Sequence, residues 1–495
     1  MKNLLETIWS NRRIAVLIVA VLSSFAALLA AWVMPRGPLT STQALLIMAI
    51  GLLLGLTAGL VFGRGWTALL AAGVFIAVYE LSRLHVQGPT VDLITLNSVY
   101  GVIAFITGRL VYWALLLLPM IPGSVLGSTL AGRLSERFSA QGSILRGLIA
   151  ILVGIAVVAL AVVILRPAKT HPVIGQDGVS VPGSVAELTQ VEIGGVQQTL
   201  MIRGRDQDNP VLLYLAGGPG GTDLGAMRAD TSLEEYFIVV TWDQRGTGKS
   251  YAAIDPLDKM TLDQMLSDTI EVTNYLRERF GEEKIYIVGN SWGTILGTLA
   301  VQQHPELYYA YVGTGQMVSP RETDVMFYED TLAWAEQTGQ VDLVNTLKQN
   351  GPPPYADLLD YEPVISHEHD WNPYPELGNS VEMPFNTFVP ENTFMDRVNA
   401  MRGLLDTFAA LYPQLQEVDF RSDISRLELP FYMVLGAHEA RGRSVLADEW
   451  FEMLSAPYKE VVVFEHSGHR PPFEEPGTFT ELMKQIRDDT YSAER

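Results

Sequence analysis

Charge and apolar residues are distributed very unevenly along this chain of 495 residues. Residues 1–170 contain 12 Lys and Arg side chains against 4 Asp and Glu side chains, whereas residues 171–495 contain 22 against 51. The formal net charge is therefore +8 in the first part and −29 in the second. Long apolar runs occupy most of the first part. The first part is apolar and the second is strongly acidic. The sequence therefore predicts an all-helical transmembrane domain, residues 1–168, followed by an acidic soluble region.

The first long apolar run, residues 14–33, is 20 residues long and carries no charge. As a helix it is long enough to cross a hydrocarbon core of about 30 Å. A cleaved signal peptide is the alternative interpretation, but the run is long for a signal peptide and further apolar runs follow it. We therefore expect five transmembrane spans, with four or six as alternatives. The expected spans are residues 14–33, 42–62, 66–79, one within 100–130, and 148–165.

Positively charged residues near these spans predict the orientation of the domain, because short cytoplasmic loops are enriched in Lys and Arg. With the N-terminus in the cytoplasm, seven of these residues lie inside and two outside. The seven are Lys2, Arg12, Arg13, Arg64, Arg133, Arg137 and Arg146, and the two are Arg36 and Arg83. An odd number of spans then places everything after Arg166 on the outer face of the cell membrane. We expect an extracytoplasmic soluble region.

Arg109 lies inside the fourth apolar segment and has two interpretations. An arginine within a membrane span can mark a functional polar site. It can also lie near a helix end and extend its guanidinium to the interface. We favour the second interpretation, because no paired acidic residue or repeated motif indicates a transport path.

Composition excludes several classes of function for the soluble region. An acidic domain of this size repels nucleic acid, and no basic patch with interleaved aromatic residues argues otherwise. The chain contains no cysteine, which excludes disulfides, thiolate metal sites and a cysteine nucleophile. The lack of cysteine does not select a compartment.

The soluble region reads as strands alternating with helices. It follows a linker rich in Pro, Gly and polar residues at 169–184, and its first two strands form a hairpin around Gly194-Gly195. The expected strands are residues 188–193, 197–202, 211–215, 237–241, 285–288, 309–312, 431–435 and 460–464. Apolar strands alternating with helices predict a mostly parallel sheet with helices on both faces.

This sheet is expected to be interrupted once, between its sixth and seventh strands. Residues 319–423 show no convincing series of strands and read mainly as helices and loops, with a break at Gly351-Pro352-Pro353-Pro354. We interpret them as an inserted helical cap placed over a substrate pocket. The core of the fold is then formed by residues 185–318 and 424–495.

A sharp turn between a strand and a helix is predicted at Gly289-Asn290-Ser291-Trp292-Gly293. The pattern Gly-x-Ser-x-Gly directly after a buried strand is typical of a nucleophile elbow. Glycines two residues before and after the serine are needed because a backbone that turns this tightly leaves no room for side chains. The turn exposes the hydroxyl of Ser291 and leaves the amide of Trp292 free to face a developing oxyanion.

A serine hydroxyl becomes a good nucleophile only when a histidine takes its proton, and an acid must orient that histidine. In an α/β-hydrolase the chain order is serine, acid, histidine. His469 lies just after the last expected strand and is preceded by a glycine. His466 is the alternative, although it lies closer to the strand end and lacks that glycine.

The acid is expected in the loop after the seventh strand. Glu439, in Gly436-Ala437-His438-Glu439, is the nearest carboxylate there. Asp448 is the next one, but it falls inside an expected helix. Spacing alone does not decide between them, because carboxylates are common in this region.

A second oxyanion donor is expected from the loop after the third strand, Ala216-Gly217-Gly218-Pro219-Gly220-Gly221. Backbone amides can approach a substrate closely only where side chains are absent, which explains the glycines. A phosphate-binding loop is the alternative, but the spacing fits neither Gly-x-Gly-x-x-Gly nor a Walker loop with its lysine.

Together these motifs resemble the prolyl iminopeptidase family of α/β-hydrolases. That family is marked by His-Gly-Gly-Pro-Gly, Asp-Gln-Arg-Gly-x-Gly-x-Ser and Gly-Gly-Ser-Trp-Gly. The corresponding residues here are Gly217-Gly218-Pro219-Gly220, then Asp243-Gln244-Arg245-Gly246-Thr247-Gly248-Lys249-Ser250, then Gly289-Asn290-Ser291-Trp292-Gly293. The resemblance extends from about residue 190 to the end and says nothing about residues 1–170.

The resemblance implies Ser291 as nucleophile, His469 as general base and then general acid, and Glu439 as the acid that orients it. The amides of Gly218 and Trp292 would form the oxyanion hole. No cofactor or metal ion is implied.

The Asp243–Ser250 loop looks structural by the same resemblance, with Arg245 bracing the active-site loops through an ion pair. Three positions depart from the family pattern. Ala216 replaces the usual histidine, Glu439 stands where aspartate is usual, and Gly442-Arg443 stands where Thr-Pro is often found. These departures bear on the oxyanion loop and on the choice of the acid.

Substrate-binding residues are harder to predict. Gly217 lies in the oxyanion loop, and family aminopeptidases hold the ammonium group of the substrate with cap carboxylates. The candidates for that role are Glu322, Asp324, Glu329 and Asp330. Residues 320–423 contain 19 Asp and Glu against 5 Lys and Arg, so a solvated surface is the alternative for each.

His367-Glu368-His369-Asp370 has the composition of a metal cluster. It lacks a further ligand at a recognisable spacing, so we interpret it as a polar loop of the cap.

The sequence therefore predicts a membrane-anchored serine hydrolase. The expected activity is that of a prolyl-iminopeptidase-like aminopeptidase acting on small peptides or esters through an acyl-enzyme. A carboxylesterase or amidase with the same triad is one alternative, and a membrane sensor or scaffold that uses the fold for binding alone is another. An aspartate-nucleophile dehalogenase or epoxide hydrolase is disfavoured because residue 291 is serine.

Overall fold

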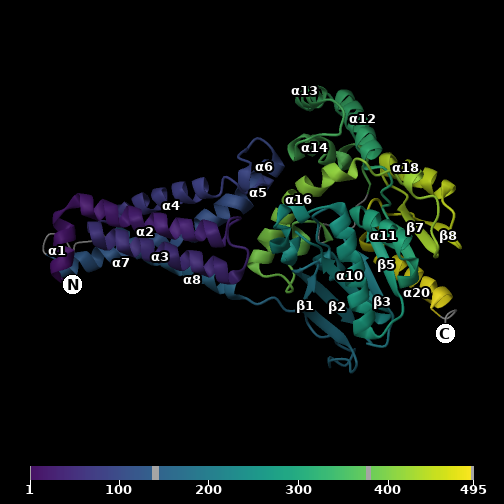
Figure 1. Cartoon of the computed structure of the whole chain (residues 1–495), viewed down its shortest axis with the longest axis horizontal. Helices are drawn as coiled ribbons and strands as arrows, with labels where there is room; N and C mark the ends of the chain where they lie inside the picture. The colour runs from purple at the N-terminus through teal and green to yellow at the C-terminus, as the bar shows by residue number, and fades with distance from the viewer. Residues whose placement is uncertain (1, 136–143, 375–380, 492–495) are drawn as a thin grey trace. The chain divides into compact units, whose positions relative to one another are not determined.

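A computed structural model of the chain describes residues 2–135, 144–374 and 381–491 (Figure 1). The chain forms two compact units, each with its own hydrophobic core. The apolar helical unit comprises Met1–Asn97, Gly101–Pro167 and Thr393–Val398. The sheet unit comprises Ser98–Tyr100, Ala168–Asn392 and Asn399–Arg495. Arg137, one of the residues used to predict orientation, lies outside the described residues.

Among the described residues, five helices are long and apolar enough to cross a membrane. They are α2 (Arg12–Val33), α3 (Ser41–Phe62), Gly65–Ser82 with α4 (Ala68–Ser82), Val99–Leu134, and Gly147–Leu165 within α8 (Ile144–Leu165). A short helix, α1 (Lys2–Ser10), precedes them. The five apolar helices expected from the sequence are thus present, and the fourth is the longest, at 36 residues.

The fourth apolar helix is irregular near its start. It consists of α6 (Val99–Phe105), a π-helical turn at Ile106–Leu110, and α7 (Val111–Leu134), which continues through Pro119 and Pro122. Such π turns are single-turn features inside longer helices. These two prolines therefore do not end the helix.

Arg109, in the π turn, differs from the expectation of an arginine that extends to the surface. It is 4% exposed, and its Nη1 donates a hydrogen bond to the carbonyl oxygen of Leu93 at 2.9 Å. Its Nε lies 3.5 Å from Glu80 Oε2. The acidic partner that the sequence did not reveal is therefore present on the preceding apolar helix. The interpretation as a snorkelling arginine was wrong.

Helices α3 and α7 pack with their backbones in close contact. Three glycines spaced four residues apart on α3 face α7, and a Cβ atom at any of them would lie within 2.3 Å of a carbonyl oxygen of α7. The three are Gly51, Gly55 and Gly59. Small residues at this spacing allow helices to approach closely in a membrane, where the hydrophobic effect does not drive them together.

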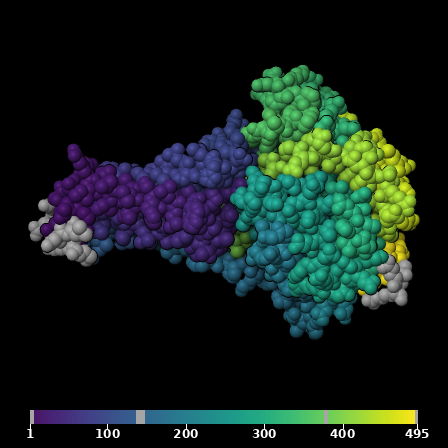
Figure 2. All heavy atoms as spheres, viewed as in Figure 1, coloured from purple at the N-terminus to yellow at the C-terminus, as the bar shows by residue number. Residues whose placement is uncertain are grey.

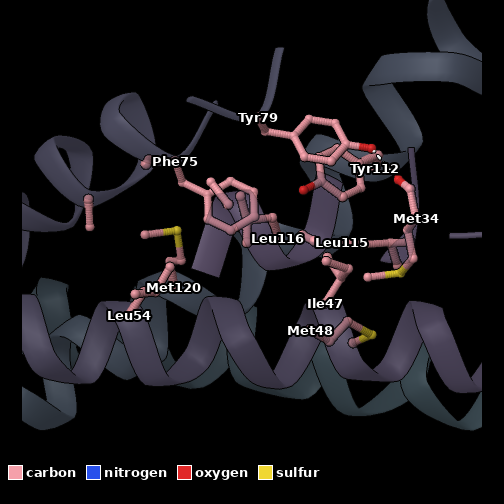
Figure 3. Packing of buried hydrophobic residues seen from close by; sticks show 14 of the residues in the cluster. Met34, Ile47, Met48, Leu54, Phe75, Tyr79, Tyr112, Leu115, Leu116 and Met120 are labelled. Atoms are coloured by element: carbon pink, nitrogen blue, oxygen red, sulfur yellow. Dashed lines mark hydrogen bonds between the residues drawn. The ribbon is translucent and has the colours of Figure 1, made fainter. Parts of the chain in front are cut away.

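Aromatic side chains fill the space beside these helices (Figure 3). The rings of Tyr79 and Tyr112 stack with centroids 4.5 Å apart, and Phe75 lies about 6 Å from each. The hydroxyl of Tyr79 donates a hydrogen bond to the carbonyl oxygen of Met34 at 2.8 Å. This contact ties the end of α2 to α4.

The sheet unit contains an eight-stranded sheet, in the order β1-β2-β4-β3-β5-β6-β7-β8. Its β1 and β2 form a hairpin, β2 is antiparallel to β4, and the remaining neighbours are parallel. The strands are β1 (Val185–Ile193), β2 (Val196–Gly204), β3 (Val211–Leu215), β4 (Ile238–Asp243), β5 (Ile285–Asn290), β6 (Tyr308–Thr314), β7 (Phe431–Gly436) and β8 (Lys459–Phe464). All eight strands expected from the sequence are present, and the mostly parallel sheet is confirmed.

Helices cover both faces of this sheet. Tyr286 and Val288 of β5 belong to a core that includes Met483 of α20 (Pro476–Thr490). Ile285 and Ile287 point to the opposite face, because successive side chains of a strand alternate, and they are also fully buried. Helices α10 (Leu262–Phe280) and α11 (Trp292–Gln303) lie across that face (Figure 1).

Helices follow one another between β6 and β7, where the sequence predicted an insertion. They are α12 (Pro320–Thr338), α13 (Val341–Asn350), α14 (Leu358–Ile365), α15 (Glu368–Trp371), α16 (Phe394–Leu415) and α17 (Phe420–Asp423). We call residues 319–423 the inserted segment. Thr323 Oγ1 in α12 donates a hydrogen bond to the carbonyl oxygen of Gly442 in α18 (Arg441–Met453) at 2.8 Å. In Figure 2 the green surface of the inserted segment borders the yellow-green surface that follows β7.

Candidate active site

Ser291 occupies a one-residue turn between a strand and a helix. Strand β5 ends at Asn290 and α11 begins at Trp292. The φ angle of Ser291 is 53°, and it is the only non-glycine residue with a positive φ among those described. This conformation is costly for a residue with a side chain and is found mainly at functional sites. The amide of Ser291 donates a hydrogen bond to the carbonyl oxygen of Thr314 at 3.0 Å, which anchors the turn to β6.

The two glycines that flank the turn are required by close backbone contacts. A Cβ atom at Gly289 would lie 2.5 Å from the carbonyl oxygen of Gly293. A Cβ atom at Gly293 would lie 2.2 Å from the carbonyl oxygen of Leu215, at the end of β3. Both glycines are therefore sterically required, as the sequence indicated.

The glycine-rich loop after β3 lies beside Ser291. A Cβ atom at Gly217 would be 3.4 Å from the Cβ atom of Ser291. Gly218 has a φ of 133°, a conformation that only glycine adopts readily. The amide of Gly217 donates a hydrogen bond to Asp223 Oδ2 at 3.4 Å. The loop thus brings backbone next to the serine, as its sequence indicated.

Gln244 connects this loop to the serine turn. Its Oε1 accepts a hydrogen bond from Trp292 Nε1 at 2.9 Å, and its Nε2 donates one to the carbonyl oxygen of Ala216 at 3.4 Å. All three residues are buried. The motif that contains Gln244 looked structural from the sequence alone, and this contact could not be predicted because it depends on two loops that meet in space.

Arg245, the next residue of the motif, forms the buried ion pair that the resemblance implied, for which the sequence named no partner. Its Nε lies 2.7 Å from Asp268 Oδ2 on α10, and its Nη2 donates a hydrogen bond to the carbonyl oxygen of Gly194 at 3.1 Å. Arg245 therefore fixes the motif to α10 and to the β1–β2 hairpin. The ion pair is present, but it does not join other active-site loops.

His469 and Glu439 lie in direct contact. His469 Nδ1 is 2.7 Å from Glu439 Oε2. The carbonyl oxygen of His469 accepts a hydrogen bond from Asn290 Nδ2 at 3.2 Å, which links the histidine loop to the serine turn. A Cβ atom at Gly315 would lie 2.8 Å from the imidazole ring. These loops follow the carboxyl ends of parallel strands, the edge where sheets of this kind bind ligands.

The two alternative residues are less well placed. The side chains of His466 and Asp448 are both exposed. The backbone amide of His466 donates a hydrogen bond to Glu475 Oε1 at 2.9 Å. Geometry therefore favours the pair Glu439 and His469.

Glu439 is a fully buried carboxylate with partners on both oxygens. Its Oε1 accepts hydrogen bonds from Arg443 Nε at 2.6 Å and from the amide of Ala440 at 2.9 Å. Burial alone would raise the pKa of Glu439, but the charges and hydrogen bonds of Arg443 and His469 outweigh it and lower the pKa to about 2. Glu439 is therefore ionised at neutral pH.

A second carboxylate, Glu474, supports the histidine loop. Its Oε2 accepts a hydrogen bond from the amide of Gly468 at 2.7 Å, and its Oε1 accepts one from the hydroxyl of Tyr374 at 2.8 Å. Burial raises the pKa of Glu474, against the opposing effect of these hydrogen bonds and of His469. None of the sequence motifs had indicated this role for Glu474.

The carboxylates considered as substrate anchors have partners of their own. Glu322 pairs with Arg421. Glu329 and Asp330 pair with Arg441, at 3.1 and 2.8 Å. The contacts described for Glu322 and Glu329 are thus with arginines rather than with Ser291 or His469.

Asp324 is the buried member of this group. It accepts hydrogen bonds from Tyr412 at 2.6 Å and Gln416 at 3.1 Å. Burial raises the pKa of Asp324 to about 7.

The segment with the composition of a metal cluster makes ordinary polar contacts. His367 Nδ1 lies 2.7 Å from Asp370, and Glu368 pairs with Arg443. Within residues 2–135, 144–374 and 381–491, no group of three or more His, Asp or Glu side chains is placed to hold a metal ion.

Comparison with known proteins defines the class of this chain. The profile of the alpha/beta hydrolase fold family matches residues 210–476. The match covers more than half of the chain, includes Ser291, Glu439 and His469, and begins after the last apolar helix. The chain therefore belongs to the alpha/beta hydrolase fold family.

Relatives within this family carry peptidase names. A probable aminopeptidase of Bacillus subtilis (strain 168) is 30% identical over 314 residues, which are 61% of this chain and 96% of the relative. A probable proline iminopeptidase of Leptolyngbya boryana is 29% identical over 131 residues, 26% of this chain and 39% of the relative. The crystal structure of proline iminopeptidase from Mycobacterium smegmatis covers 62% of this chain and 100% of its own, with 16% identity and a TM-score of 0.46. The similarity to proline iminopeptidases expected from the motifs is confirmed.

Proposed function

We propose that this protein is a membrane-anchored serine hydrolase that acts as a prolyl-iminopeptidase-like aminopeptidase. The observation that carries the proposal is Ser291, held at a φ of 53° beside a glycine-rich loop and joined through Asn290 to the loop of His469. The buried pair of His469 and Glu439, 2.7 Å apart, supplies the base and its orienting acid. The peptidase names of the relatives support the choice of substrate class.

In the proposed mechanism, the hydroxyl of Ser291 attacks the carbonyl carbon of the scissile bond while His469 takes its proton. Glu439, ionised and fixed, accepts the hydrogen bond from Nδ1 of His469 and stabilises the imidazolium. The amides of Gly218 and Trp292 stabilise the oxyanion. His469 then protonates the leaving amine, and a water molecule activated by the same histidine hydrolyses the acyl-enzyme.

The five apolar helices are proposed to anchor the enzyme in the cell membrane. The distribution of Lys and Arg between their loops favours a cytoplasmic N-terminus, which places the hydrolase on the outer face. In this proposal residues 1–168 form the membrane domain and 169–184 the linker. Residues 185–318 and 424–495 form the catalytic core, and residues 319–423 form a cap over it.

A carboxylesterase or amidase with the same three residues is the second candidate. It is favoured by one observation: Glu322 and Glu329, expected to hold the ammonium group of a peptide, are paired with arginines. A site whose carboxylates are already paired with arginines would not select for a free amino group on the substrate. Gly217, beside Ser291, serves either substrate equally.

The nucleophile can be tested with the full chain in detergent micelles and a fluorophosphonate probe, which labels active serines covalently. Wild type is expected to be labelled, and Ser291→Ala is expected to lose both labelling and turnover. Ser267→Ala, a change of an exposed serine on α10, is the matched control and should behave as wild type. Labelling that persists in Ser291→Ala would refute the assignment. A folded wild-type protein without labelling would favour a sensor or scaffold.

Substrate class can be tested separately. Aminoacyl arylamides with free and acetylated amino groups, together with simple aryl esters, are offered to the same preparation. A preference for the free amino group supports the peptidase, and indifference to it supports the esterase. Protease applied to intact cells is expected to cut the catalytic domain, and a protected domain would contradict the proposed orientation.

A further inference from the structure

Arg443 lies buried between two carboxylates that come from different parts of the fold. Its Nε donates a hydrogen bond to Glu439 Oε1 at 2.6 Å, and its Nη2 pairs with Glu368 of α15. Its guanidinium carbon lies 4.7 Å from the centre of the Phe327 ring in α12. The side chain of Arg443 is 8% exposed, that of Glu439 0% and that of Glu368 18%. A planar guanidinium suits this bridging position because it offers donors on two sides.

The two oxygens of the Glu439 carboxylate therefore contact different partners: Arg443, which is a cation, and His469, which becomes one when protonated. Its Oε2 contacts His469, while Arg443 and the amide of Ala440 occupy Oε1. A buried carboxylate without such partners is strongly destabilised. Both the orientation of Glu439 and the net charge beside His469 thus depend on Arg443.

The segment that carries Glu368 also contacts the loops of the acid and the histidine. Asn372 Nδ2 donates a hydrogen bond to the carbonyl oxygen of His438 at 2.8 Å. The ring of Tyr374 stacks on His438 with centroids 5.7 Å apart, and its hydroxyl bonds to Glu474. Residues 368–374 of the inserted segment therefore contact both loops, and Glu368 provides the charged contact among them.

We propose that Arg443 is a positioning residue for the Glu439–His469 pair, and that Glu368, contributed by the inserted segment, counteracts the charge of Arg443. The proposal rests on the proposed function of Ser291, His469 and Glu439. When Glu368 is in place, it compensates the charge of Arg443. Without the carboxylate of Glu368, Arg443 is left with Glu439 alone, and the charge balance at His469 becomes more positive.

Other charged groups also lie near His469 and Arg443. Glu474 lies on α19 (Pro471–Glu474) and interacts with His469. Arg470, next in the chain, pairs with Asp223 and Glu382. Asp324 of α12 interacts with Arg443. None of the variants proposed below alters these groups.

Arg443 and Glu368 carry opposite charges, so removing one or the other should shift the acidic limb of the activity profile in opposite directions. Arg443→Met removes a positive charge, which favours the imidazolium form of His469. The acidic limb of the activity profile should then move to higher pH, by roughly one unit for a charge a few ångströms beyond the carboxylate. Glu368→Gln removes a negative charge and should move the same limb to lower pH, by roughly half a unit. A purely structural contact would not produce shifts of opposite direction.

The test measures the rate of fluorophosphonate labelling at Ser291 between pH 5 and 9, with the full chain in detergent micelles. The variants are Arg443→Met, Arg443→Lys and Glu368→Gln. Arg443→Lys keeps the charge and should return the limb close to its wild-type position, with a lower maximal rate because one of the two contacts is lost. Arg441→Gln, which removes an exposed arginine two residues away, is the matched control and should leave the profile unchanged.

Opposite shifts in Arg443→Met and Glu368→Gln, with recovery in Arg443→Lys, support the proposal. Unchanged limbs, or shifts in the same direction, would overturn it while leaving Ser291-dependent labelling intact. If Arg443→Met does not fold, the limb positions of Glu368→Gln and Arg443→Lys decide between the same outcomes. If the folded wild-type protein is not labelled at Ser291, both the proposed function and this inference are overturned.

Discussion

Glycine serves different purposes in the two units of this molecule. In the apolar helical unit, Gly51, Gly55 and Gly59 lie in a regular helix, and their missing side chains let α3 contact the backbone of α7. In the sheet unit, Gly289 and Gly293 flank a turn at Ser291, where a strand and a helix cross. The first set lets two helices associate closely, whereas the second set makes room for the positive φ angle of Ser291. Close backbone contact therefore serves helix packing in one unit and the proposed nucleophile in the other.

Buried ion pairs show the same contrast. Arg109 in the apolar helical unit contacts Glu80 and a loop carbonyl, so that its charge holds a loop against a helix. Arg443 in the sheet unit contacts Glu439, which in turn contacts His469. One arginine joins structural elements, and the other adjusts a residue proposed to take part in the reaction.

The largest expected effect comes from filling the space at the serine turn. Gly293→Ala would place a Cβ atom 2.2 Å from the carbonyl oxygen of Leu215, displacing the amide of Trp292 from the proposed oxyanion hole. We expect turnover to fall by roughly 1,000-fold, as for loss of an oxyanion donor. Gly477→Ala, where the structure leaves open space, is the control. Near-normal turnover of Gly293→Ala in a kinetic assay would contradict the role given to this turn.

The corresponding change in the apolar helical unit should affect stability and spare the chemistry. Gly55→Leu places a side chain against the backbone of Met120, and overpacking of this kind costs about 1–3 kcal/mol. Thermal unfolding in detergent should shift to lower temperature, while labelling of Ser291 persists below the transition. Gly154→Leu on α8, where nothing lies within 4 Å, should leave the transition unchanged. Loss of labelling at low temperature would show that the two units are not independent.

A smaller effect is expected at Gln244. Gln244→Leu leaves Trp292 Nε1 without its partner, a loss of about 1–3 kcal/mol in stability, and frees the loop of Ala216. We expect kcat to fall roughly tenfold, because misplacement of an oxyanion donor weakens transition-state binding.

A second tryptophan–glutamine hydrogen bond in the sheet unit provides the control for this test. Trp242 Nε1 donates a hydrogen bond to Gln198 at 3.0 Å, and Gln198→Leu should lower stability without lowering kcat. Equal losses of kcat in the two variants would mean that Gln244 acts only through stability.

An effect on stability alone, with no change in kcat, is expected at Asp324, whose pKa is raised by burial to about 7 from an ordinary value of 3.8. The folded state then binds the proton more tightly than the unfolded state, so the free energy of unfolding falls as the pH rises from about 4 to 7. Asp324→Asn should lack this decline, which melting curves across that range would show. Asp330→Asn, at a carboxylate paired with Arg441, should keep it. A pH profile of Asp324→Asn parallel to that of wild type would contradict a buried, protonated Asp324.

Local pattern predicted most of the fold because its elements are regular. The strand at 285–290 begins with the short apolar run 285–288, and the helix at 12–33 contains the uncharged run 14–33. Each can be recognised without its neighbours. The contact of Glu439 with His469 was expected from the family resemblance, because spacing alone did not decide between Glu439 and Asp448.

Contacts between distant parts of the chain could not be predicted in this way. Glu80 and Arg109 are 29 residues apart, and only the packing of their helices shows that they pair. The contacts of Gln244 with Trp292 and of Arg443 with Glu368 likewise depend on loops that meet in space. Arg245 was correctly expected to form an ion pair, but its partner on α10 could not be read from the motif.

The π turn at Ile106–Leu110 has a further consequence for the fourth apolar helix. A turn of this kind contains one more residue than an α-helical turn, and each residue rotates a helix by about 100°. Arg109 in the turn faces the carbonyl of Leu93, while Gly123 and Gly127 further along face α3. Removing a single residue from the turn would rotate these glycines by about 100° relative to everything before them. The extra residue therefore changes the rotation of all later side chains about the helix axis, so that one continuous helix presents two differently oriented contact faces.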